Sequence, residues 1–353
     1  MSDTPPSRSV PGLALRSYAG TQDIPAIAAI FNAEHAADGI PEWILEDDLR
    51  SDYANPNEHF DPDRDVVVGE VDGQPVAVAV ANWIDTNDGE LREHRMFGAV
   101  HPDWRRRGIG SVLFADNERR ARELAQTHRT QRQRVVATFS GERQYGLHAL
   151  TDARGYERVR YFFDMIRPHL DDVPDVALPA GLAIRSTRPE DHQRVWDALV
   201  EAFRDHWGGF DDSPQAFRRW VESPHFEPEL QVIAYDGEEV AGGVVNGIAR
   251  EENARLRVQR GWLHQVFTRR TWRRRGLARA LIARSLVMLR EHGMREAALG
   301  VDAENPSGAL GLYEDLGFAV AERYTAHRKR LTLDGEAAHD ARPNQTNGDD
   351  RDE

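Results

Sequence analysis

The sequence predicts an α/β protein built from two tandem copies of one domain. A glycine-containing turn between an apolar strand and a helix occurs twice, and its tryptophans, Trp104 and Trp272, lie 168 residues apart. The pattern Leu-Ala-Leu-Arg-Ser at 13–17 returns as Leu-Ala-Ile-Arg-Ser at 182–186, an offset of 169 residues. Two matching offsets make chance similarity between strands a poor explanation, and a chain of 353 residues is long enough for two ordinary domains.

The predicted elements follow the same order in both halves. A helical pattern comes after each first strand, at 24–37 and at 191–203. A hairpin comes next, with an Asp-Gly turn at 72–73 or 236–237 between β-rich segments. The four hairpin strands are expected at 65–71, 75–83, 230–235 and 239–248.

A strand, a glycine turn and a helix follow each hairpin. In the second half the strand at 262–267 leads into Arg-Arg-Arg-Gly-Leu-Ala at 273–278, and in the first half the turn reads Arg-Arg-Arg-Gly-Ile-Gly at 105–110. Small residues let the backbone approach a ligand closely, and the free N–H groups that begin a helix attract anions. Such a turn suits a pyrophosphate, and the arginines match phosphate geometry. A further strand, at 134–139 or 296–301, and a short helix and strand close each half.

The two turns resemble the pyrophosphate-binding motif of the GNAT acetyltransferase superfamily, Arg/Gln-x-x-Gly-x-Gly/Ala. The segment 305–318 reads Asn-x-x-x-Ala-x-x-x-Tyr-x-x-x-Gly-Phe, which is similar to the closing motif of the same family. The resemblance covers roughly 13–333 and implies a splayed mixed sheet that binds acetyl-coenzyme A. A dinucleotide fingerprint is excluded because its third glycine would fall at Leu113, and no Gly-Lys-Ser/Thr indicates a Walker loop.

The resemblance and the duplication together predict two tandem GNAT-like domains in a mixed α/β sheet. The first half is expected to be degenerate and the second catalytic. The predicted segments are a disordered leader at 1–11, an N-terminal domain at 12–167, a linker at 168–180, a C-terminal domain at 181–334 and a disordered acidic tail at 335–353.

The closing motif assigns the chemistry to the second half. Asn305 and Tyr313 are spaced so that both are expected on one helix face. In the family the asparagine contacts the cofactor arm and the tyrosine lies near its sulfur, so Tyr313 is the expected proton donor to the departing thiolate. Outside such a motif a tyrosine at this spacing is usually a core residue. The first half has Thr151 and Arg143 at these two positions, and neither replaces the family residue.

A general base is also expected, because an acceptor amine must lose its proton before it attacks. The family often places this base on the strand before the glycine turn. His264 is the titratable residue best placed there, and histidine titrates in the right range. Glu304 is a second candidate, and a packed or cofactor-edge histidine is the alternative interpretation of His264.

The predicted cofactor-binding residues are the strand ends and the two turns. In the second half the backbone of the strand is expected to hold the thioester carbonyl and the pantetheine arm. The full set is Val266, Phe267, Thr268, Arg273, Arg274, Arg275, Gly276, Leu277, Ala278 and Asn305, with Val100, Arg105, Arg106, Arg107, Gly108, Ile109 and Gly110 in the first half.

Composition limits the other possibilities. The net charge of −14 argues against nucleic acid as a partner despite the arginine triplets, and the only lysine is Lys329. No cysteine is present, so a disulfide or a thiol nucleophile is excluded. No metal site is expected, because no spaced histidine pair has a carboxylate partner. No apolar run spans a membrane, the leader lacks a signal-peptide core, and a cytoplasmic monomer or homodimer is expected.

The predicted function is therefore acetyl-coenzyme A-dependent transfer of an acetyl group to a primary amine of a small molecule, with the chemistry in the second half. A non-catalytic coenzyme A-binding sensor or scaffold is the alternative. The first half, which lacks the tyrosine, fits that alternative better than the second half does.

Overall fold

The computed structural model describes residues 10–223, 225–305 and 308–333. The acidic tail expected at 335–353 lies outside the described residues, as do the first nine residues of the expected leader. Below, the first half means residues 10–167 and the second half residues 182–333.

The first half contains six strands and the helices that cover them. The glycine turn predicted at 105–110 leads directly into its longest helix. In order the elements are β1 (Leu13–Ser17), α1 (Ile24–Asp38), α2 (Glu46–Ala54), α3 (Pro62–Asp65), β2 (Val66–Val71), β3 (Gln74–Asp85), β4 (Leu91–Val100), α4 (Ile109–Thr127), β5 (Gln133–Gly141), α5 (Tyr145–Ala153) and β6 (Glu157–Arg167).

The second half follows a similar order, but no α-helix in its described residues matches α3, and one extra helix lies between its hairpin and its central strand. The periodicity had not predicted α2, α3, α7 or α8, which are short and flank loops. In order the elements are β7 (Leu182–Ile184), α6 (His192–Phe203), α7 (Pro214–Glu222), β8 (Val232–Asp236), β9 (Glu239–Gly247), α8 (Arg250–Leu256), β10 (Arg260–Thr268), α9 (Leu277–Glu291), β11 (Glu296–Asp302), α10 (Ala309–Asp315) and β12 (Ala319–Arg330).

All twelve of these strands form one continuous mixed sheet, in the order β1-β2-β3-β4-β5-β12-β6-β11-β10-β9-β8-β7. Each strand of the first half has a counterpart in the second half, β1 with β7 and so on to β6 with β12. When every strand is exchanged for its counterpart, the strand order of the sheet is the same read from the other edge. The two halves are therefore related by a pseudo-twofold axis that passes between β6 and β12. The mixed α/β sheet expected from the sequence is confirmed, and it is shared by the two halves.

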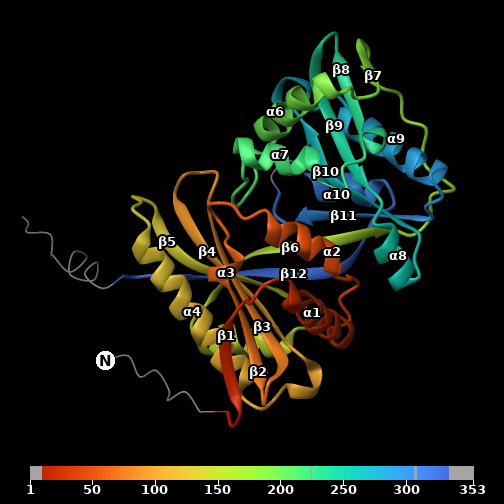
Figure 1. Ribbon diagram of the computed structural model, residues 1–353. Helices are drawn as coiled ribbons and strands as arrows, with labels where there is room; N and C mark the ends of the chain where they lie inside the picture. The colour runs from red at the N-terminus through yellow and green to blue at the C-terminus, as the bar shows by residue number, and fades with distance from the viewer. Residues whose placement is uncertain (1–9, 224, 306–307, 334–353) are drawn as a thin grey trace, which may run out of the picture.

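The last strand of each half is exchanged. β12 pairs with β5 of the first half, and β6 pairs with β11 of the second half, all antiparallel. In Figure 1 the blue β12 lies beside the yellow-green β6 where the two halves meet. Met165 of β6 is fully buried in the core of the second half, and Leu331, just after β12, is buried in a core of the first half. Each half thus completes the hydrophobic core of the other.

Helices cover both faces of each half-sheet. Alternate residues of a strand point to opposite faces. In β8, Val232 and Ala234 join the core under α9, whereas Ile233 and Tyr235 join the core under α6. We call these two sides the α9 face and the α6 face. Leu263 and Met165 lie in the α9-face core, so their strand neighbours Trp262 and Asp164 lie on the α6 face.

The halves also dock through loops related by the same pseudo-symmetry. The loop after α6 contacts the β3–β4 connection, where the Asn87 side chain donates to the backbone oxygens of Phe203 and His206 at 3.1 and 3.0 Å. The loop after α1 contacts α8, where the Trp43 N–H donates to Glu252 Oε1 at 3.1 Å. These contacts hold both loops over the α6 side of the central strands.

Candidate functional site

The central strands of the second half separate into a fork. The parallel strands β10 and β11 are paired only from Arg260 to Trp262 on β10 and from Glu296 to Ala298 on β11. Both strands continue beyond this point, to Thr268 and Asp302. The edge of β10 that faces β11 therefore offers backbone donors and acceptors beyond Trp262, and an extended ligand can enter between the strands. We call this opening the second fork.

A β-bulge places His264 at the second fork. The pairing of β10 with β9 shifts between Leu263 and Gln265, so that His264 is the extra residue. Its ring lies parallel to that of Trp262, with 6.2 Å between the ring centroids, so both project to the α6 face. A Cβ built on Gly247 of β9 would lie 2.6 Å from His264 Nε2, so only glycine leaves room for this ring.

The His264 side chain keeps an exposed surface, although many protein groups lie near its ring. Burial lowers the pKa of His264 below its ordinary value, and the nearby His225 lowers it further. Both effects favour the neutral imidazole, which is the form that can accept a proton.

The turn before α9 is shaped as an anion site. Arg274 and Gly276 both have a left-handed backbone, with φ of 60° and 80°. No atom lies within 4 Å of a Cβ built on Gly276, so the space in front of the turn is open. The first N–H groups of a helix have no intrahelical acceptor and point outward at its positive end. Arg274 and Arg275 are exposed, and neither has an ion-pair partner in the described part of the chain. The residues present therefore fit a pyrophosphate.

The first arginine of each turn has a different role from its neighbours. Arg273 donates through Nε to the backbone oxygen of Thr268 at 3.0 Å and forms an ion pair with Asp205 at 2.9 Å. In the first half Arg105 binds Asp38 at 2.7 Å and reaches the backbone oxygen of Val100 at 3.3 Å. Arg270 and then Arg273 lower the pKa of Asp205 to about 2, so this carboxylate stays charged. These arginines fix the turn to the preceding strand and helix.

Tyr313 lies on the opposite face of the sheet from His264. It is 7 % exposed, packs edge-on against Phe318 and belongs to the core under α9. Burial raises the pKa of Tyr313 to about 12, so the phenol keeps its proton at neutral pH. Its hydroxyl has no hydrogen-bond partner among the residues the structure describes, although it is not fully enclosed.

The expectation that Asn305 shares a helix face with Tyr313 is wrong. Helix α10 begins at Ala309, after Gly308 in the left-handed region with φ of 73°. Asn305 lies in the preceding loop, where its N–H donates to the backbone oxygen of Asp302 at 3.1 Å. It still lies directly beyond the end of β11. Glu304, the second candidate base, is exposed and forms an ion pair with Arg160 at 3.0 Å.

The corresponding fork of the first half is built differently. The pairing of β4 with β3 runs without a shift from Val100 to Arg92, so there is no bulge, and Met96 is buried. Thr138 Oγ1 donates to the Met96 backbone oxygen at 2.8 Å, across the point where β4 and β5 separate. Phe97 and Phe139 lie parallel across the same opening, with ring centroids 6.4 Å apart.

The first turn and helix also differ from their counterparts. Val10 Cγ2 lies 3.4 Å from a Cβ built on Gly108, so an apolar side chain lies beside the turn that is open in the second half. Ile109 begins α4 with its side chain buried in the adjacent core, and Gly110 is the second residue of that helix. Thr151, at the position of Tyr313, is fully buried and donates to the His148 backbone oxygen at 2.9 Å.

The remaining predicted residues of the second half lie along β10 and at the start of α9. Val266 and Thr268 lie in β10 beyond the pairing with β11, and the Phe267 side chain is buried under α6. Leu277 is the first residue of α9 and is buried, and Ala278 follows it in the first turn of that helix. The structure thus places Tyr313 in the core under α9, and Val266 at the end of β10 packs against that same core. It also brings Asp164 to the second fork, which no pattern in the sequence had indicated.

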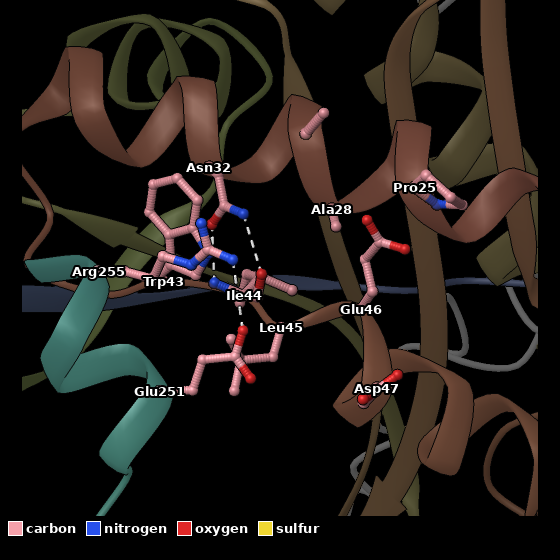
Figure 2. Close-up of a pocket in the computed structure, with 11 residues that line it drawn as sticks. Pro25, Ala28, Asn32, Trp43, Ile44, Leu45, Glu46, Asp47, Glu251 and Arg255 are labelled. Carbon is pink, nitrogen blue, oxygen red and sulfur yellow. Dashed lines mark hydrogen bonds and ion pairs between the residues drawn. The ribbon is translucent and has the colours of Figure 1, made fainter.

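Figure 2 shows a separate pocket of about 400 Å³ between α1, the segment 43–47 and α8. The Asn32 side chain holds the Ile44 backbone through two hydrogen bonds, of 2.9 and 2.7 Å, at the wall of this pocket. Trp43 and Arg255 line the same pocket from opposite halves of the molecule. None of the predicted site residues lines it.

No group of three or more His, Asp or Glu side chains in the described ranges is arranged to hold a metal ion. No helix in these ranges is long and apolar enough to cross a membrane.

The chain matches two models of one protein family. Residues 193–318 match the Acetyltransferase (GNAT) family, and residues 62–145 match an Acetyltransferase (GNAT) domain. The mycothiol acetyltransferase of Salinispora arenicola is 30% identical over 240 residues, which are 65% of this chain and 70% of that protein. The mycothiol acetyltransferase of Geodermatophilus obscurus is 27% identical over 299 residues, covering 84% of this chain and 90% of that protein.

Solved structures show the same two-domain layout. A GCN5-related N-acetyltransferase from Sphaerobacter thermophilus has a TM-score of 0.70 and 26% identity, covering 92% of this chain and 97% of that chain. A tandem GNAT protein from the clavulanic acid biosynthesis pathway has a TM-score of 0.64 and 18% identity, covering 91% of this chain and 99% of that chain. At this identity the second comparison supports the fold alone.

Proposed function

The chain belongs to the GNAT acetyltransferase family, and on that premise we propose that it transfers an acetyl group from acetyl-coenzyme A to a primary amine of a small molecule. The reaction takes place at the second fork. The observation that carries this assignment is the asymmetry of the two forks. Only the second combines a bulge, an open glycine turn and a buried tyrosine among the described residues.

Acetyl-coenzyme A would supply the activated acetyl thioester. The turn around Gly276, with Arg274 and Arg275, would hold its pyrophosphate, because the turn begins α9, has open space at Gly276 and carries two exposed arginines. The free edge of β10 from Val266 to Thr268, with Asn305, would hold the pantetheine arm. These assignments follow the places of the residues around the fork.

His264 and Tyr313 divide the proton transfers between the two faces of the sheet. His264, on the α6 face, takes a proton from the acceptor amine, and its lowered pKa keeps it neutral for that purpose. Tyr313, on the α9 face, gives its proton to the departing thiolate. The amine and the leaving group thus approach from opposite sides of the fork, so neither proton transfer obstructs the other.

The narrower proposal is acetylation of a cysteinyl pseudo-disaccharide, as expected of an enzyme like the mycothiol acetyltransferases. It is supported by the length over which those relatives align, which includes both halves. A soluble cytoplasmic enzyme is part of the same proposal.

We expect the purified protein to add a deuterated acetyl group from labelled acetyl-coenzyme A to this acceptor. The product is detected by mass spectrometry, because the acceptor's own thiol interferes with reagents that detect released coenzyme A.

The rival function is non-catalytic binding of coenzyme A. It predicts calorimetric binding of acetyl-coenzyme A without label transfer to the pseudo-disaccharide or to a panel of amino sugars and aminoglycosides. Transfer to amino sugars alone would keep the acetyltransferase and replace the acceptor. Binding with no transfer to any amine would remove the enzymatic proposal.

A further inference from the structure

We propose that Asp164, which β6 of the first half carries to the second fork, binds the positively charged amine of the acceptor. The proposal rests on the proposed function, because it names the side chain that receives the acceptor at that site. It assigns to the first half a direct part in the reaction of the second.

The register of the sheet places Asp164 beside the fork. Asp164 pairs with Gly300 of β11, and Gly300 lies two residues beyond the last residue of β11 that pairs with β10. His264 likewise lies two residues beyond the last paired residue of β10. Residues directly opposite in an antiparallel pair lie on one face of the sheet. On the α6 face, Asp164 of β6 therefore lies beside Gly300 of β11. His264 of β10 lies on the other side of the fork from Gly300.

Gly300 leaves the floor between Asp164 and the fork open. A Cβ built on Gly300 would lie 3.4 Å from Asp164 Oδ1, so any larger side chain there would stand between this carboxylate and the fork. The corresponding opening of the first half is lined by Phe97 and Phe139. The second fork thus has a glycine where the first has an aromatic ring, which leaves room for a small polar group beside Asp164.

Asp164 lacks a cation of its own. The Tyr324 hydroxyl donates to Glu42 Oε1 at 3.4 Å. The same hydroxyl lies close enough to Asp164 to lower the pKa of that carboxyl, but it brings no positive charge. Neither Asp164 nor Glu42 forms an ion pair within the described residues. Arg260, the nearest arginine that acts on Asp164, is itself paired with Glu296 at 2.8 Å. An ammonium group would supply the missing positive charge.

The charged groups around Asp164 come from four elements. Glu42 in the loop after α1 and Glu322 on β12 raise its pKa, and Arg260 on β10 and the Tyr324 hydroxyl lower it. Glu252 of α8 faces Glu42. Burial is the largest cause, and together these effects bring the pKa of Asp164 to about 6. The carboxylate is charged above this pH and loses its charge as the pH falls through it.

The test compares two probes that differ only in the amine. One is cysteinyl-glucosamine and the other is 3-sulfanylpropanoyl-glucosamine, which lacks the amino group. Binding of each to the full-length protein with saturating coenzyme A is measured by calorimetry at pH 7.5. We expect the amine probe to bind at least about tenfold more tightly, the range of a charge-assisted hydrogen bond. Asp164→Asn should remove this preference, whereas Glu157→Gln, an exposed carboxylate on the same strand, should keep it.

Two further variants decide the matter if Asp164→Asn fails to fold. Tyr324→Phe should raise the pH at which the preference is lost, because the hydroxyl no longer lowers the pKa of Asp164. Glu42→Gln should lower that pH, because a neighbouring negative charge is gone. The proposal is overturned if the wild type binds neither probe or binds both equally well. It is also overturned if Asp164→Asn still prefers the amine probe, or if neither variant changes the pH at which that preference is lost. If the wild-type protein prefers the amine probe but transfers no acetyl group to it, the proposed function is wrong and the role of Asp164 in binding the amine stands.

Discussion

At the scale of single residues, the site depends on two side chains whose titration is set by burial. Tyr313 keeps its proton because burial raises its pKa to about 12, and His264 loses its proton readily because burial lowers its pKa. The two groups thus stand in opposite protonation states at neutral pH, as an acid and a base must. Their environments set these states, since neither group forms an ion pair among the described residues.

Replacing Tyr313 by Phe should lower kcat by about a hundredfold, the usual contribution of a positioned acid. The ring and its packing against Phe318 remain, so the affinity for acetyl-coenzyme A should stay near that of the wild type. Thr151→Val, at the matching position of the first half, is the control and should leave kcat unchanged. Single-turnover rates are the measurement of choice if product release limits kcat. Inactivation by Thr151→Val with a silent Tyr313→Phe would place the chemistry in the first half.

The pH profile should report His264. A base with a lowered pKa stays neutral and active as the pH falls below its ordinary value of about 6.5, and activity declines only below its folded-state pKa. The acidic limb of kcat at saturating acceptor should therefore lie below pH 6.5. It should disappear in His264→Gln, with kcat at pH 7.5 reduced by about tenfold or more. An unchanged limb in that variant would mean that another group is the base.

At the scale of elements, the second fork combines a strand, a turn and a helix whose backbone geometry is specific. The bulge moves His264 out of register, and the left-handed Gly276 lets the chain turn into α9 with its N–H groups outward. The first half has the same turn, with φ of 91° at Gly108, but its strand has no bulge. The binding turn and the reactive strand are therefore separable features.

A glutamate at the turn should abolish binding of acetyl-coenzyme A. Gly276→Glu would place a negative side chain where the pyrophosphate is proposed to lie. Gly293→Glu is a matched control, because Gly293 also has a positive φ, of 85°, and open space around its Cβ, but lies at the opposite end of α9. Both variants carry similar backbone strain, so a difference in calorimetric affinity isolates the charge. Equal affinities in two folded variants would remove the turn from the cofactor site.

At the scale of the whole molecule, the two halves are one structural unit. β6 provides Met165 to the core under α9, and Leu331 fills a core of the first half. Removing either half would expose an unpaired strand edge and an incomplete core in the other. The second half therefore needs the first half to complete its sheet and core and, by our proposal, to supply Asp164.

Separating the halves should disable the second one. A fragment of residues 181–353 lacks β6, so β11 loses its partner and the core loses Met165. We expect this fragment to be insoluble or to bind no acetyl-coenzyme A, whereas co-expression with residues 1–180 should give a soluble complex that purifies together. Size-exclusion chromatography and calorimetry measure both results. A soluble monomeric fragment with wild-type affinity would show that the exchanged strand is dispensable.

The sequence by itself determined the duplication, the hairpins, the glycine turns and the tyrosine of the closing motif. Each depends on a short stretch of chain, because turn residues and hydrophobic periodicity report local backbone geometry. Asp72-Gly73, for example, indicates a tight turn wherever it stands between strands, and both residues have a positive φ here.

Only the tertiary structure decided which strands exchange, where the bulge falls and which face receives Asp164. The choice of partner for β6 depends on free edges of strands far away in the chain, and no local pattern records it. The bulge at His264 is defined by the pairing of β10 with β9. Helix α10 begins after Asn305 because Gly308 has a left-handed backbone, which the helical spacing of the sequence does not indicate. Pairing and packing across the whole sheet fix these features, because their free energy comes from contacts that form only when both halves are folded together.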